Sequence, residues 1–211
     1  MPSPPFPKQR MSSGQRRAAI VDAAVQLFAQ NGFRGTTTRQ IAAAVGVSEP
    51  VLYMHFQTKR DLYSAIIEKM AGGALGEQHM KEMAAIAGTR DDERFFRYLA
   101  HEMLKWHEEE PARMRILLFS ALEGHELSEM FYQRHVVSFL ESFASYIRSR
   151  IEDGAFRPVD PLPAAKSFCG MITSYAERLL VFSLHEPDAL KDQTVDTMIS
   201  IYLNGLRQPN R

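Results

Sequence analysis

Apolar residues recur at helical spacing along most of the chain. From Ile20 onward they occur at i, i+3, i+4, i+7 and i+8, which places them on one face of a helix. The pattern predicts a helix over residues 15–31, ended by Gly32 in a left-handed conformation. Further helices are expected over residues 37–45, 49–56, 58–70, 91–108, 111–124, 128–152 and 162–185, and after Pro187. No strand-like alternation and no internal repeat are found, so the predicted fold class is all-α.

Capping signals mark the starts of the short N-terminal helices. Thr37 and Gln40 have the spacing of a capping box, in which each side chain satisfies the other residue's free backbone N–H. Thr58 and Asp61 repeat this spacing before the next long helix. Ser48 is expected to cap the helix between them, with Pro50 in its first turn, where the missing N–H costs nothing.

The two short helices are joined by the tight turn Gly46-Val47-Ser48. This arrangement indicates a helix-turn-helix, whose second helix is short enough to enter a DNA major groove about 12 Å wide. An αα-hairpin with no DNA role has the same pattern, so geometry alone leaves both readings open.

The formal net charge of zero conceals an asymmetry. Residues 1–60 contain eight Lys and Arg but two acidic residues, a net charge of +6, so the rest of the chain carries −6. A basic segment favours a polyanionic partner, although chance clustering of surface charge is the alternative. Residues 1–12 contain four prolines and little apolar content, and are expected to form a disordered basic arm.

Composition excludes several other classes of protein. The 211 residues are 45% hydrophobic and 24% charged, as in ordinary soluble globular proteins. No uncharged apolar stretch approaches the roughly 18 residues of a membrane span, and the N-terminus lacks the apolar core of a signal peptide. The lone Cys169 excludes an internal disulfide and a multi-cysteine zinc site. A cytoplasmic location is expected.

Several motifs between Gly14 and Met70 occur in a fixed order. They are A-x-x-L-F at the end of the first helix, G-F, T-T-x-x-x-I-A, G-V-S, L-Y-x-x-F and K-x-x-L, all within the run IVDAAVQLFAQNGFRGTTTRQIAAAVGVSEPVLYMHFQTKRDLYSAII. As a set they resemble the N-terminal domain of the TetR (tetracycline repressor) family of bacterial transcriptional regulators. The resemblance covers roughly a quarter of the chain closely. It implies an all-α dimer that binds a palindromic operator and releases it when a small molecule occupies the C-terminal domain.

The resemblance also implies which residues contact DNA. Thr37 and Lys59 match phosphate-contacting positions, Tyr53 and His55 match recognition-helix positions, and Arg39 is a base or phosphate reader. Each has a purely structural alternative; Thr37, for example, caps its helix. The predicted DNA-binding residues are Thr37, Thr38, Arg39, Ser48, Glu49, Pro50, Tyr53, Met54, His55 and Lys59.

Glu49 and Pro50 depart from the family pattern, in which many members have Lys or another small polar residue and then Gly or Ala. A carboxylate near DNA phosphates is unfavourable unless it accepts a hydrogen bond, for example from cytosine N4. The favoured alternative is that Glu49 complements the dipole at the N-terminus of its helix.

The last two predicted helices are apolar on more than one face, so they are expected to be buried on two sides. In the resembling family such helices form a four-helix dimer interface, while a single well-filled core is the alternative. The predicted interface residues are Met171, Tyr175, Arg178, Phe182, Met198 and Tyr202.

Methionine and aromatic residues are dense in the C-terminal two thirds, which is compatible with an adaptable apolar cavity for a small effector. For any single one of these residues, plain core is the favoured alternative. The predicted ligand-binding residues are Met103, Trp106, His107, Phe119, Phe139, Met171 and Tyr175. Glu123 and Thr173 are further candidates for orienting a ligand.

Catalytic, metal and cofactor sites are not expected. His101 and His107 are six residues apart, so they do not share a helix face. The glycines of residues 72–76 lack phosphate-binding spacing and a preceding strand.

The sequence therefore predicts a homodimeric repressor of palindromic DNA with an unknown small apolar effector and no membrane contact. Its expected parts are an arm (1–12), a helix-turn-helix domain (13–60) and a ligand-binding and dimerisation domain (61–211). A constitutive DNA-binding protein, an activator and a helical enzyme remain alternatives, the last lacking convergent acid and base groups.

Overall fold

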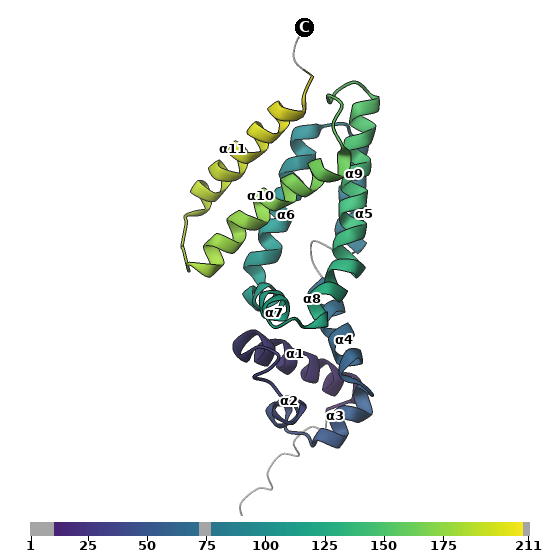
Figure 1. The fold of residues 1–211 in the computed structure, drawn as a ribbon, viewed down its shortest axis with the longest axis vertical. Helices are drawn as coiled ribbons and strands as arrows, with labels where there is room; N and C mark the ends of the chain where they lie inside the picture. Colours follow the sequence, from purple (N-terminus) through teal and green to yellow (C-terminus); the bar gives the residue numbers. More distant parts are fainter. Residues whose placement is uncertain (1–10, 72–76, 209–211) are drawn as a thin grey trace, which may run out of the picture.

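The computed structural model describes residues 11–71 and 77–208, and all regular elements within them are helices. Figure 1 shows an elongated molecule with α1, α2 and α3 at one end and α10 and α11 toward the other. The all-α prediction is confirmed. Residues 1–10 of the expected arm (1–12) and the glycines of residues 72–76 lie outside the described residues.

The N-terminal helices match their predicted positions closely. Their bounds are Ser13–Asn31 (α1), Thr38–Val45 (α2), Glu49–His55 (α3) and Lys59–Ala71 (α4). Ser12 was expected in the arm but is instead the N-cap of α1, where it forms a capping box with Gln15. Gly32 ends α1 as predicted, although its φ of 70° and ψ of −178° are not the left-handed helical conformation that was expected.

The C-terminal helices differ from the predicted ones in three places. Their bounds are Glu77–Gly88 (α5), Asp92–Glu109 (α6), Pro111–Leu122 (α7), Glu126–Phe131 (α8), Tyr132–Val136 (η1), Val137–Glu152 (α9), Pro161–Val181 (α10) and Asp188–Leu206 (α11). The α5 helix was not predicted. The helix expected over residues 128–152 is divided into α8, a π-helical turn η1 and α9, and α10 ends before residue 185. The π-turn matters because such turns are frequent at functional sites.

Buried apolar side chains form two clusters. The N-terminal cluster includes Ile20, Leu52 and Ile66 of α1, α3 and α4, but it continues into the C-terminal part through Trp106 and Phe131. The C-terminal cluster joins α5, α6, α9, α10 and α11 around residues such as Phe96, Phe143 and Phe168. Since α4 side chains lie in the N-terminal cluster, the packing does not separate at residue 60, where the sequence placed a domain boundary.

Candidate DNA-binding surface and ligand cavity

The α2–α3 unit is built by local signals. Thr37 and Gln40 form the predicted capping box at the start of α2, and Gly46 ends that helix at φ 74° and ψ 32°, the left-handed conformation that glycine tolerates. Thr58 and Asp61 form the second predicted box at the start of α4 through bonds of 2.8 and 3.1 Å. Ser48 is the N-cap of α3, but its side chain makes no capping hydrogen bond, so this part of the prediction was wrong.

The predicted DNA-binding residues lie on or beside α2 and α3, at the end of the molecule remote from α10 and α11 (Figure 1). Met54 is 82% exposed and Tyr53 is 39% exposed, so both side chains are accessible to a partner. Most of the polar members are also exposed, while Thr38, Glu49 and His55 are half-buried. Contact with DNA stays a prediction for the whole set.

Glu49 has a partner within the protein. The hydroxyl of Thr38 donates a hydrogen bond to Glu49 Oε1, and the Tyr53 hydroxyl lies 3.5 Å from Thr38 Oγ1. This contact ties the start of α2 to the first turn of α3. Because the carboxylate also lies in the first turn of α3, it complements the helix dipole there.

Several cations of the N-terminal helices are engaged within the chain. Arg17 stacks over the Phe56 ring at 4.7 Å, Arg60 pairs with Glu126 at 3.0 Å, and Lys69 pairs with Asp22 at 2.5 Å. In contrast, Arg39 and Lys59 form no ion pair with any residue in the described part of the chain. Their charges therefore remain available to a polyanion.

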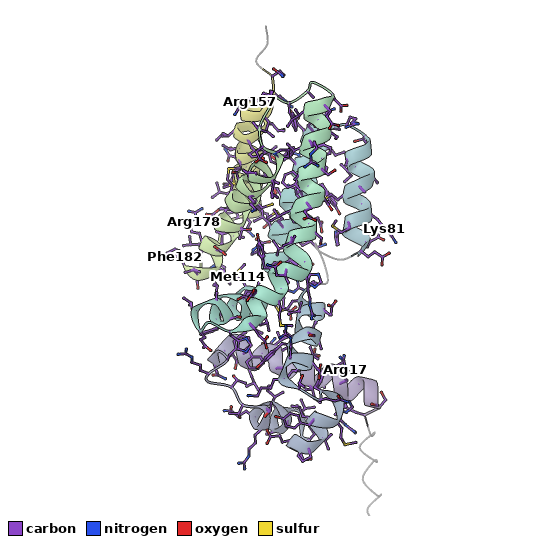
Figure 2. The ribbon with its side chains drawn as sticks, turned by 45° about the vertical axis from the view of Figure 1, so that its right-hand side comes forward. Arg17, Lys81, Met114, Arg157, Arg178 and Phe182 are labelled. Carbon is purple, nitrogen blue, oxygen red and sulfur yellow. The ribbon has the colours of Figure 1, made fainter. Side chains whose placement is uncertain are left out.

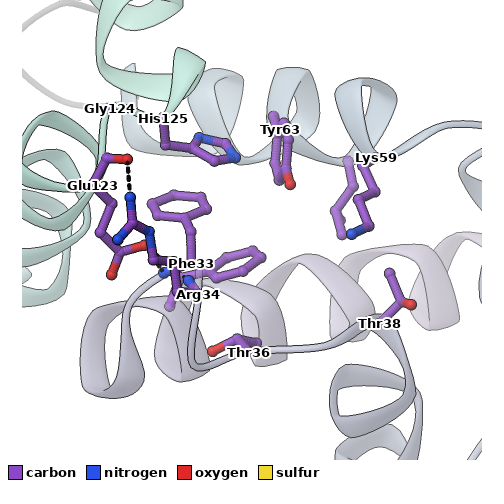
Figure 3. Close-up of a pocket in the computed structure, with 11 residues that line it drawn as sticks. Phe33, Arg34, Thr36, Thr38, Lys59, Tyr63, Glu123, Gly124 and His125 are labelled. Atoms are coloured by element: carbon purple, nitrogen blue, oxygen red, sulfur yellow. Dashed lines mark hydrogen bonds between the residues drawn. The ribbon is translucent and has the colours of Figure 1, made fainter.

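A polar and aromatic contact, which we call the Glu123 joint, connects the N-terminal helices to the turn between α7 and α8 (Figure 3). Glu123 Oε2 accepts hydrogen bonds from the backbone N–H groups of Phe33 (3.0 Å) and Arg34 (2.8 Å). The Arg34 side chain donates to the Glu123 carbonyl at 3.3 Å. Gly32 is required here, because its φ is positive and a Cβ would collide with the Glu123 carboxylate.

Aromatic rings complete the Glu123 joint. The Phe33 ring stacks on His125 with centroids 3.8 Å apart, and Tyr63 of α4 lies edge-on to His125 at 4.5 Å. His125 Nδ1 accepts the Leu127 N–H at 3.2 Å and so caps α8. Burial lowers the pKa of His125, which favours the neutral ring that this capping bond requires. A pocket of about 300 Å³ lies beside these residues.

The C-terminal helices surround a larger cavity of about 480 Å³, a size typical of small-molecule sites. Side chains from every element between α5 and α10 line it, including the π-turn, and most are apolar. The lining residues are His79, Met80, Met83, Tyr98, Leu99, Glu102, Met103, Trp106, His107, Met114, Leu117, Leu118, Ala121, Ser128, Phe131, Tyr132, Val136, Phe139, Leu140, Lys166, Cys169, Thr173 and Glu177.

Four predicted ligand-binding residues line this cavity: Met103, Trp106, His107 and Phe139. The structure corrects the other three. Phe119 of α7 packs in the N-terminal cluster beside Gly32, Met171 packs against the C-terminal cluster, and the Tyr175 hydroxyl donates to Glu186 at 2.5 Å. Of the two further candidates, Thr173 lines the cavity and Glu123 belongs to the joint.

Several polar groups of the cavity wall were not predicted from the sequence: His79, Glu102, Lys166 and Glu177. His79 of α5 lies 2.8 Å from the Glu102 carboxylate of α6. On α10, the predicted candidate Thr173 lies in a polar stripe with Lys166, Cys169 and Glu177, which recur every three to four residues. This spacing is the signal from which the other members could be found. Burial raises the pKa of the Cys169 thiol to about 12, so this cysteine is not an activated nucleophile.

The predicted dimer residues divide into three pairs. Arg178 and Phe182 are exposed at the end of α10, and Figure 2 shows both projecting from one edge of the molecule. Tyr175 is buried, and the Tyr202 hydroxyl donates to the Ala164 carbonyl while its ring packs on Phe96 and Phe168. Both tyrosines are thus engaged within their own chain, and their contact with a second copy stays a prediction. Met171 and Met198 are half-buried against the C-terminal cluster.

No cluster of three or more His, Cys, Asp or Glu side chains within residues 11–71 and 77–208 is arranged to hold a metal ion. In the same ranges, no helix combines the length and hydrophobicity needed to cross a membrane. An exposed helix-turn-helix at one end and a helical body around a cavity define a DNA-binding transcriptional regulator.

Comparison with known proteins supports this class. Residues 20–66 match the family model described as bacterial regulatory proteins of the tetR family, and residues 100–205 match the C-terminal domain of AefR-like transcriptional repressors. The transcriptional regulator RutR of Escherichia coli O157:H7 is 24% identical over 207 residues, covering 95% of this chain and 94% of RutR. The nucleoid occlusion factor SlmA of Marinobacter nauticus is 29% identical over 67% of this chain and 69% of its own.

Solved structures have the same fold. NalD of Pseudomonas aeruginosa, the secondary repressor of the MexAB-OprM efflux pump, superposes with a TM-score of 0.73 at 22% identity over 94% of this chain and all of its own. AibR, solved with isovaleryl coenzyme A and operator DNA, has a TM-score of 0.61 at 23% identity over 88% of this chain and 97% of its own. The chain belongs to the TetR family of bacterial DNA-binding transcriptional regulators.

Proposed function

We propose that this chain is a homodimeric repressor that binds a palindromic operator through α3 and releases it when a small, apolar effector fills the cavity. One contact carries the proposal: the indole Nε1 of Trp106, in the cavity wall, donates to the Met70 carbonyl of α4 at 3.0 Å. The α4 helix follows the recognition helix after a three-residue connection, so the cavity wall is bonded to the element that positions α3.

The DNA-binding end supports operator recognition. Exposed Tyr53, Met54 and Arg39 would face the major groove, and Thr37 and Lys59 would contact the backbone. Two copies of α3 entering successive major grooves would lie ~34–36 Å apart, which corresponds to a palindromic site. In this proposal α1 to α3 form the DNA-reading part, the helices from α5 onward form the effector part, and α4, which packs in the N-terminal cluster, is the link between them.

Exposed apolar side chains near α10 and α11 support dimerisation. Phe182 is 68% exposed, and Val181, Leu184, Leu190 and Ile201 are also exposed on these helices and their connection. Apolar patches of this kind mark protein interfaces, and a second copy of the same surface forms a closed two-fold dimer. Arg178 lies in the same region.

Effector binding would act through differential affinity. A ligand shifts the equilibrium only as far as it prefers the conformation whose recognition helices are misspaced. A displacement of Trp106 by the ligand would be transmitted to α4. A displacement of Leu118 and Ala121 on α7 would be transmitted to the Glu123 joint at the end of that helix. In AibR, a relative in fold, a coenzyme A ester and operator DNA are bound by the same protein.

Fluorescence anisotropy with a labelled palindrome selected by the purified protein tests the DNA-binding side. Tyr53→Ala and Lys59→Ala are each expected to weaken binding about tenfold or more, since each removes a contact at the interface, and Lys59→Ala also lowers the salt dependence by roughly one counterion per protomer. Lys81→Ala, at an exposed lysine of α5, is the matched control (Figure 2). Unchanged affinity in both reader variants contradicts the assigned surface.

Two alternative functions give different outcomes. A constitutive DNA-binding protein would bind the palindrome but show no thermal stabilisation by any small apolar compound. An activator would bind and respond identically in solution, and a reporter assay in which the chain raises expression distinguishes it. A stable monomer in light scattering contradicts the homodimer.

A further inference from the structure

One histidine in the cavity wall has an unused hydrogen-bonding atom. His107 lies on α6 and is 8% exposed. Its Nδ1 lies 2.7 Å from the Met103 carbonyl, one helical turn earlier. Because a carbonyl oxygen can only accept a hydrogen bond, Nδ1 must carry the ring proton.

The other ring nitrogen is left without a hydrogen-bond partner by the part of the chain that the structure describes. His107 Nε2 is fully buried and has no hydrogen-bond partner among the described residues. Burial lowers the pKa of His107, so the ring is neutral and Nε2 is an acceptor. A buried acceptor without a partner is rare in native proteins and costs free energy, which calls for an explanation. A donor carried by a ligand supplies one.

The surroundings of His107 restrict the chemistry of that donor. Glu177 and Glu108 lie close enough to act electrostatically on the ring, so an anionic ligand group at Nε2 would meet like charge. A protonated amine would have to give up its hydration beside this buried atom and would share the wall with the like charge of Lys166. A hydroxyl brings one donor and no charge. The rest of the wall, including Met103 and Trp106, is predominantly apolar.

We propose that the cavity recognises an uncharged, largely apolar molecule with one hydroxyl group, a phenol or an alcohol, whose O–H donates to Nε2 of His107. The inference rests on the proposed effector role of the cavity and specifies its ligand class. The apolar part of the molecule would fill the space among the methionine and aromatic side chains, where flexible methionines adapt to its shape.

Calorimetry with four probes of matched shape tests the proposal: 4-butylphenol, 4-butylanisole, 4-butylbenzoate and 4-butylbenzylamine. The wild-type dimer is expected to bind the phenol about tenfold or more tightly than the methyl ether, since the ether cannot donate and leaves Nε2 unpaired. The benzoate and the benzylamine are expected to bind more weakly than the phenol.

Two variants on the same helix assign the preference to one residue. His107→Phe keeps an aromatic ring but removes the acceptor, and is expected to reduce the preference for phenol over ether to within about twofold. His101→Phe, at a histidine that does not line the cavity, is expected to retain it. Circular dichroism and melting temperature establish that both variants fold. In ¹⁵N NMR, the unprotonated Nε2 signal of His107 is expected to move when the phenol binds.

The outcomes separate this inference from the proposed function. The hydroxyl assignment is overturned if phenol and ether bind equally, if either charged probe binds more tightly than the phenol, or if none of the four probes binds. It is also overturned if the preference for phenol over ether survives His107→Phe. If the phenol binds with the expected preference but leaves operator affinity unchanged in anisotropy, the hydroxyl site stands and the effector role fails.

Discussion

The two hydrophobic clusters differ in what they connect. The N-terminal cluster unites the DNA-binding helices with parts of α6, α7 and α8, whereas the C-terminal cluster unites α5, α6 and α9 to α11. The cavity lies where they meet, because Trp106 and Phe131 belong to one cluster while Met83 and Phe139 belong to the other. A ligand there would therefore contact two packed units at once, one of which contains the DNA-binding helices.

The clusters also differ in their polar contacts. In the C-terminal one, Asp92 binds Arg150 at 2.8 Å and accepts the Tyr146 hydroxyl at 2.6 Å, and all three side chains are largely buried. In the N-terminal one, the ion pairs of Arg60 with Glu126 and of Lys69 with Asp22 are exposed. Glu123 and Trp106 bond there to backbone groups.

The largest effect is expected from a substitution that disrupts the C-terminal cluster alone. Phe96 is fully buried and packs on Phe95, Phe143, Phe156 and Phe168. Phe96→Ala is expected to lower the free energy of unfolding by about 3–5 kcal/mol, through lost burial and the cavity left behind. Denaturant unfolding measures this. Leu122→Ala, at a side chain that is 84% exposed, is the control and is expected to change stability by less than about 0.5 kcal/mol.

Phe96→Ala also tests whether the two clusters are separate units. If they are, the folded fraction of the variant binds operator DNA with wild-type affinity, because the N-terminal cluster is untouched. If operator binding falls by more than the unfolded fraction of the variant accounts for, the two clusters are not separate units.

Sequence reasoning succeeded where the determining contacts are local. The Thr37–Gln40 and Thr58–Asp61 boxes join residues three apart, so their spacing alone predicted where α2 and α4 begin. A capping box is complete within one helical turn and needs no knowledge of the tertiary fold. The N-terminal helices were therefore predicted to within a few residues.

The cavity could not be predicted to the same degree, because its wall joins residues from six helices and the π-turn. On α7, Leu118 and Ala121 face the cavity while Phe119 packs toward α1. The periodic spacing of apolar residues identifies a helix. It does not show which of its apolar side chains line a cavity and which pack against a neighbouring helix. For the same reason Tyr175 was assigned to a ligand and to a dimer, although it is satisfied within its own chain.

An intermediate effect is expected at the Glu123 joint. Glu123→Ala removes the acceptor of two backbone N–H groups and is expected to lower stability by about 1–3 kcal/mol. Glu123→Gln retains an acceptor oxygen and is the matched control. If the joint transmits the effector signal, Glu123→Ala also reduces the shift in operator affinity that a bound ligand produces. An undiminished shift would assign transmission to the contact between Trp106 and Met70 alone.

The smallest expected effect is a pH dependence that both regions share. Burial lowers the pKa of His107 in the cavity wall and of His125 in the Glu123 joint, below the ordinary value of about 6.5. Between the lowered and the ordinary value the unfolded chain binds more protons than the folded one, so stability rises with pH in that window and is lost as the pH falls below about 6.5. Each histidine contributes at most about 1.4 kcal/mol per pH unit.

Two variants divide this dependence between the regions. The more deeply buried His107 is expected to contribute the larger share, so His107→Phe should flatten the rise of melting temperature between pH 5 and 7.5 more than His125→Asn, which retains a side-chain acceptor for capping α8. Thermal unfolding across this range measures both slopes. The reverse order would place the greater cost of protonation in the joint, and acid would then loosen the contact to the DNA-binding helices before it disturbed the cavity.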